Sequence, residues 1–104
     1  MDDREEIVKE IFDKINKVFE DNAHDPDDLY DVDMYITDVK AVDWSEHKGN
    51  TDYPCYFTEA LILFVRETEP YVYYGTIGLS IILDELTRWA SEYFAGGIKC
   101  FSGT

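Results

Sequence analysis

Apolar residues recur at steps of three and four positions between residues 7 and 19. Charged and polar side chains fill the remaining positions, so this segment has the period of an amphipathic helix with one buried stripe. Asp2 or Asp3 can cap the start of such a helix, and Glu5 and Glu6 follow where the helix dipole favours negative charge. The pattern predicts a surface helix whose apolar stripe consists of Ile7, Val8, Ile11, Phe12, Ile15, Val18 and Phe19.

Three later segments are rich in the β-branched and aromatic residues that favour strands. Residues 32–42 alternate imperfectly between apolar and polar side chains, which indicates an edge strand or a β-bulge. The segment 53–66 contains the apolar run ALILFV, as expected for a central strand covered on both faces. YVYY at 71–74 predicts a third strand, and residues 44–52 form a polar connection. We expect antiparallel pairing because the links between neighbouring segments are short.

The helical period returns after Gly75. Thr76 or Ser80 can cap this second helix, Gly96 and Gly97 can end it, and IKCFS at 98–102 can form a last strand. Its apolar stripe consists of Leu79, Ile82, Leu83, Leu86, Trp89, Ala90 and Tyr93. The chain is therefore predicted to be a single acidic α+β domain over residues 1–104, of order α-β-β-β-α-β. Its two helices would cover one face of a small antiparallel sheet of three to four strands.

The composition is that of a folded but strongly acidic protein. Apolar residues make up 45% of the chain, which is too high for a disordered segment, and the formal net charge is −14. Such a charge repels nucleic acid and anionic membranes, while it attracts basic proteins over long distances. The charged amino terminus does not resemble a signal peptide, and no apolar run is long enough for a membrane span. We therefore expect a cytoplasmic protein that binds neither nucleic acid nor membrane directly.

The residues that most often perform catalysis or bind cofactors are few. His24 and His47 lie in polar segments without a triad pattern, and Cys55 lies in an apolar segment where burial makes a thiol inert. Cys55 and Cys100 are expected to be buried thiols, with a disulfide between them as the alternative. The aspartates at 25–33 do not have the spacing of a calcium loop, and the glycines near Gly75 match no nucleotide-binding loop. We expect a non-enzymatic protein with no cofactor and no metal site.

Acidic residues are concentrated in the first half of the chain. Residues 1–52 contain 17 acidic and 6 basic residues, whereas residues 53–104 contain 6 and 3. Residues 19–38 alone hold eight carboxylates and no Lys or Arg. Pro26 allows a single helical turn capped by Asp25, and in the predicted strand Asp31 and Asp33 would project on one face about 6.6 Å apart. A regular row of carboxylates would resemble the phosphates of a nucleic acid.

These features predict an acidic inhibitor that binds a basic, nucleic-acid-handling protein, such as a nuclease, by carboxylate mimicry of phosphates. Two settings suit it: a phage protein directed against a CRISPR or restriction effector, and an immunity protein for a nuclease toxin. Tyrosine is common at interface centres, so two tyrosines of the acidic stretch are predicted to anchor the partner. The alternative is a small structural or assembly adaptor that self-associates, for example as a homodimer, through a tyrosine-rich sheet. The predicted partner-binding residues are Asp25, Asp27, Asp28, Tyr30, Asp31, Asp33 and Tyr35.

Overall fold

The computed structural model describes residues 3–22 and 31–96, and all regular structure in these ranges is helical. The elements are α1 (Asp3–Asn22), α2 (Val32–Lys40), the short 3-10 helix η1 (Ser45–His47), α3 (Tyr53–Thr68) and α4 (Tyr71–Ala95). The predicted α+β fold with an antiparallel sheet is therefore wrong, because the described part is a four-helix all-α structure without a strand.

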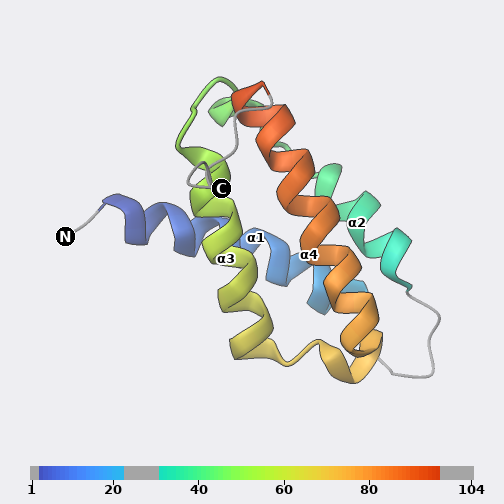
Figure 1. Cartoon of the computed structure of the whole chain (residues 1–104). Helices are drawn as coiled ribbons and strands as arrows, with labels where there is room; N and C mark the ends of the chain where they lie inside the picture. The colour runs from blue at the N-terminus through green and yellow to red at the C-terminus, as the bar shows by residue number, and fades with distance from the viewer. Residues whose placement is uncertain (1–2, 23–30, 97–104) are drawn as a thin grey trace.

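The four helices surround one shared core. α1 packs against α3 and, less extensively, against α2, whereas α4 packs against both α3 and α2 (Figure 1). Trp44, which follows α2, is buried in the same core, and its Nε1 donates a hydrogen bond of 2.8 Å to the backbone oxygen of Val39. Fully buried side chains from every helix meet here, including Ile11, Ile15, Tyr35, Val39, Phe57, Leu61, Phe64, Ile82 and Leu86.

The two longest predicted strands are helices because their buried positions follow a helical period. In α2, Tyr35, Ile36 and Val39 are buried, which is the i, i+1, i+4 pattern of one helix face rather than an alternation. In α3, the buried residues Phe57, Leu61 and Phe64 also recur at steps of three and four. An apolar run cannot distinguish a buried strand from a buried helix by itself. At 16 residues, α3 has the length of a helix rather than of a strand.

The predicted third strand, residues 71–74, is the first turn of α4. Gly75 then breaks the helical backbone with φ 71° and ψ 174°, a conformation that is available almost only to glycine. The predicted helix over 79–93 is confirmed, and so is the stop at Gly96, which ends α4 with a φ of 65°. The amino-terminal helix over 7–19 is likewise confirmed within α1. The expected strand at 98–102, Gly97 and the turn after Pro26 lie outside the described residues.

Candidate functional site

Two of the seven predicted partner-binding residues lie on the surface at the start of α2. Asp31 is the N-cap of the helix, where its Oδ1 accepts a hydrogen bond of 2.9 Å from the backbone N–H of Met34. Asp33 is exposed in the first turn. Asp25, Asp27, Asp28 and Tyr30 lie outside the described residues. The structure therefore brings Asp31 and Asp33 together at one helix terminus.

The regular row of carboxylates predicted from strand geometry is not formed by these two residues. Side chains two positions apart share a face on a strand, but on an α-helix they point about 200° apart around the axis. Asp31 also has the extended backbone of a cap, with φ −87° and ψ 178°. Asp33 follows inside the helix, so the two carboxylates spread around its terminus.

Tyr35 lies in the core and not on the surface. Its side chain is fully buried, and its hydroxyl donates a hydrogen bond of 3.0 Å to the backbone oxygen of Ile15 on α1. Its ring stacks on Phe64 of α3 with centroids 5.7 Å apart and an interplanar angle of 12°. The prediction that Tyr35 anchors a partner therefore has to be corrected, because one face of α2 is inserted between α1, α3 and α4.

Three of the seven acidic residues of α1 have a lysine partner on the same helix. Lys9 lies 3.6 Å from Asp13, and Lys17 lies 3.3 Å from Asp21. Lys14 lies 3.4 Å from Glu10 in a third pair of this kind. These exposed i,i+4 pairs neutralise the surface of α1 locally, although each contributes little to stability. The negative charge in the middle and second half of α1 is therefore compensated in part.

The start of α2 has no such compensation. Within residues 3–22 and 31–96, neither Asp31 nor Asp33 forms an ion pair, and Lys40 is the first basic residue after them in the chain. Asp43, which follows α2, accepts hydrogen bonds from the backbone N–H and the hydroxyl of Ser45, at 3.1 and 2.6 Å. These bonds lower the pKa of Asp43 and keep it ionised. The start of α2 therefore carries two carboxylates without a basic partner in the described residues, and Asp43 lies beyond the other end of the helix.

The start of α2 lies directly against the first half of α4. A Cβ atom on Gly78 would come within 3.0 Å of Val32 Cγ2, so glycine allows the close approach of the two helices. Burial raises the pKa of the Tyr74 hydroxyl above its ordinary value, and the nearby Asp31 carboxylate raises it further. These contacts place Asp31 beside the turn of α4 that contains Tyr74 and Gly78.

The same part of α4 exposes large apolar side chains that the sequence interpretation did not select. Ile77 is 79% exposed, and Val72 is 58% exposed. Tyr71, Tyr73 and Ile81 are also exposed. The strand predicted for residues 71–74 gave no indication of this exposed apolar surface. In a helical reading, Ile77 and Ile81 are one turn apart, on a different side from the buried Leu79, Ile82 and Leu86.

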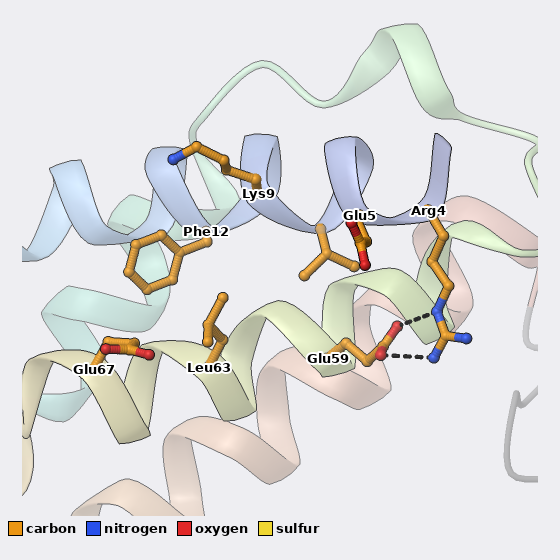
Figure 2. Close-up of a pocket in the computed structure, with 8 residues that line it drawn as sticks. Arg4, Glu5, Lys9, Phe12, Glu59, Leu63 and Glu67 are labelled. Carbon is orange, nitrogen blue, oxygen red and sulfur yellow. Dashed lines mark hydrogen bonds and ion pairs between the residues drawn. The ribbon is translucent and has the colours of Figure 1, made fainter. Parts of the chain in front are cut away.

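A separate groove of about 460 Å³ lies between α1 and α3 (Figure 2). Val8, Phe12 and Leu63 supply its apolar lining. At one end, the guanidinium of Arg4 donates two hydrogen bonds to the Glu59 carboxylate, Nε to Oε2 at 2.8 Å and Nη2 to Oε1 at 2.6 Å. The remaining rim residues are Glu5, Lys9 and Glu67. Because both signs of charge line this groove, it favours a cationic partner less than the start of α2 does.

The candidate catalytic and metal-ligating residues do not assemble in the described part. His47 stacks on the ring of Tyr53 with centroids 4.3 Å apart, and its Nε2 lies 3.7 Å from Glu10 Oε1. Cys55 is half-buried on α3, while His24 and Cys100, and with Cys100 the alternative disulfide, lie outside the described residues. No group of three or more His, Cys, Asp or Glu side chains in residues 3–22 and 31–96 is arranged to hold a metal ion.

Comparison with known proteins gives no relative from which a role can be transferred. No protein-family model, curated protein or solved structure matches this chain. Among the described helices, none is both long enough and apolar enough to cross a membrane.

Proposed function

We propose that this protein is a non-enzymatic inhibitor that binds a basic, nucleic-acid-handling protein through the acidic surface at the start of α2. The observation that carries this proposal is the uneven compensation of charge. Glu10, Asp13 and Asp21 of α1 have lysine partners at 3.3 to 3.6 Å, whereas Asp31 and Asp33 have no ion pair within the described residues. A surface that needed charge only for solubility would not require this local excess.

The electrostatics of the whole chain support the same kind of partner. With a net charge of −14, the molecule attracts a cationic protein surface at distances of about one Debye length, about 8 to 10 Å at moderate salt. Asp25, Asp27 and Asp28 precede Asp31 closely in the sequence and add three further negative charges to this segment. A nuclease or another effector that binds phosphates has a complementary surface. Both a phage inhibitor and a toxin-immunity protein remain compatible with this chemistry.

The alternative, an adaptor that self-associates through a tyrosine-rich sheet, loses its predicted surface. Residues 3–22 and 31–96 contain no sheet, and Tyr35 and Tyr53 are buried inside the helical core. A homodimer would also bring two chains of charge −14 together. Self-association therefore needs another surface.

The proposal can be tested with a small basic nuclease and a core histone as probes, each bound to a fluorescent DNA duplex. The chain should displace the DNA at low salt, and added salt should weaken this competition. Asp31→Asn/Asp33→Asn removes two charges and retains an N-cap side chain, because asparagine caps as well as aspartate. We expect its competition to weaken about three- to thirtyfold.

The matched control is Asp13→Asn/Asp21→Asn, which changes the net charge by the same amount on α1. Both of its aspartates have lysine partners, so we expect the control to compete almost as well as the original chain. Equal weakening of both double variants would show that only total charge matters. Absence of competition at low salt with either probe would contradict the proposal.

A further inference from the structure

The first half of α4 exposes more apolar surface than a helix of an isolated domain requires. Ile77 is 79% exposed and Val72 is 58% exposed. Single exposed apolar residues are normal on proteins, but a group of them on one segment marks an interaction surface. The group consists of Tyr71, Val72, Tyr73, Ile77 and Ile81, and we refer to it as the α4 apolar surface.

This surface adjoins the acidic start of α2. Val32 touches α4 at Gly78, the residue after Ile77, and Asp31 lies close enough to Tyr74 to influence its titration. Figure 1 shows α2 running alongside α4. One partner can therefore contact carboxylates of α2 and apolar side chains of α4 at the same time.

The charges around the α4 apolar surface indicate which partner fits it. Residues 67–87 contain four acidic residues and no Lys or Arg, and residues 18–39 also lack Lys and Arg. A second copy of this chain would place acidic residues against acidic residues around the contact, which is unfavourable. A partner whose apolar side chains are flanked by Lys and Arg satisfies both parts of the surface.

The shape of the surface favours a helix as the contacting element. Ile77 and Ile81 are one turn apart on α4, so their side chains form a short ridge along the helix. Ridges of this kind pack into the grooves on another helix, with axes about 8 to 10 Å apart. The partner's apolar residues would need the same helical spacing.

We propose that the α4 apolar surface binds a cationic amphipathic helix of the partner, whose basic residues contact Asp31 and Asp33 at the start of α2. This inference rests on the proposed function and adds the apolar part of the same interface. It replaces Tyr35, which is buried, by α4 residues as the anchors of binding. Binding should then have one part that salt weakens and another that salt leaves intact.

Two synthetic peptides of equal length and charge provide the probes. The first is a Lys/Leu peptide with all leucines on one helical face, and the second has serine in place of every leucine. Binding is measured by fluorescence anisotropy at about 0.05 M and about 0.5 M salt, where screening differs strongly. The Lys/Leu peptide should bind at both salt concentrations, and the Lys/Ser peptide only at the lower one.

The variant Ile77→Ser/Ile81→Ser removes the ridge without touching the core. We expect it to bind the Lys/Leu peptide about tenfold more weakly or worse, and the Lys/Ser peptide as before. Ile62→Ser changes another isoleucine, 50% exposed on α3, and should leave both affinities unchanged. Circular dichroism and thermal unfolding of each variant check that the fold is retained.

The outcomes separate this inference from the proposed function. If Asp31→Asn/Asp33→Asn weakens both peptides while Ile77→Ser/Ile81→Ser weakens neither, the acidic surface stands and the α4 inference is wrong. If neither peptide binds at low salt, both proposals fail. Light scattering that shows a dimer dissociated by Ile77→Ser/Ile81→Ser would assign the surface to a second copy and overturn the inference. Equal loss with Ile62→Ser would place the contact elsewhere.

Discussion

Removal of the phenol oxygen should lower stability at one buried tyrosine and leave it unchanged or raise it at another. The Tyr35 hydroxyl donates a 3.0 Å hydrogen bond to the Ile15 backbone oxygen and so connects α2 with α1. The Tyr53 hydroxyl is equally buried, but it has no hydrogen-bond partner within the described residues. Tyr→Phe substitution is nearly isosteric in both cases. The difference between the two variants therefore isolates the hydrogen bond.

For Tyr35→Phe we expect a loss of about 1 kcal/mol in the free energy of unfolding, the net value of a typical buried hydrogen bond. In a domain of this size, that corresponds to a fall in Tm of about 4 to 8 °C. For Tyr53→Phe we expect a change between zero and a gain of about 1 kcal/mol, because the unpaired hydroxyl no longer has to leave water.

Urea unfolding followed by far-UV circular dichroism measures both changes. Tyr71→Phe is the control, because this side chain is 51% exposed, and its effect should stay within about 0.5 kcal/mol. Partner or peptide binding by Tyr35→Phe should match that of the original chain, since the ring is not on the surface. Unchanged stability of Tyr35→Phe, or a larger loss for Tyr53→Phe, would show that the Tyr35 hydrogen bond does not stabilise the fold.

Three further predictions concern α2, α4 and high pH. Asp31→Ala should lower the free energy of urea unfolding by about 1 kcal/mol, because the backbone N–H of Met34 loses its hydrogen-bond acceptor. Asp31→Asn should lower it much less, since asparagine can also cap. Equal losses for the two variants would argue against capping. Gly75→Ala should lower the free energy of unfolding by about 1 to 3 kcal/mol, because alanine is strained in the backbone conformation of Gly75. A Cβ there meets no atom within 4 Å, so no side-chain clash adds to this cost. An unchanged free energy of unfolding would contradict the break in α4. Burial raises the pKa of Tyr53 and of Tyr74, so the folded state keeps protons that the unfolded state loses above about pH 10. Stability should therefore fall above that pH by up to about 1.4 kcal/mol per pH unit for each tyrosine, and Tyr53→Phe/Tyr74→Phe should flatten the profile; a slope identical to that of the original chain would exclude these groups as its cause.

The helical periods at both ends of the chain could be predicted because polar and apolar faces alternate clearly there. Residues 7–19 and 79–93 each show a stripe with charged residues between, and both lie in helices. The segment 53–66 could not be assigned in this way, since apolar residues occupy almost every position. Its buried set, with Phe57, Leu61 and Phe64, becomes visible only once α1 and α4 are in place.

In the candidate site, too, some features could be predicted from the sequence and others depend on packing. The absence of Lys and Arg from residues 18–39 is a property of the sequence, and it marked Asp31 and Asp33 correctly as surface acids. The sequence did not indicate which aromatic and aliphatic residues are exposed near these two aspartates. Tyr35 has the composition of an interface residue, but it faces three other helices.

The net charge of −14, its concentration in the first half and the presence of enough apolar residues for one core all follow from the amino-acid sequence. These quantities depend only on which residues the chain contains and in what order. The burial of Tyr35 and the exposure of Ile77, in contrast, result from the packing of the helices against one another. Burial depends on which side of each helix meets a neighbour, and local propensity does not contain that information.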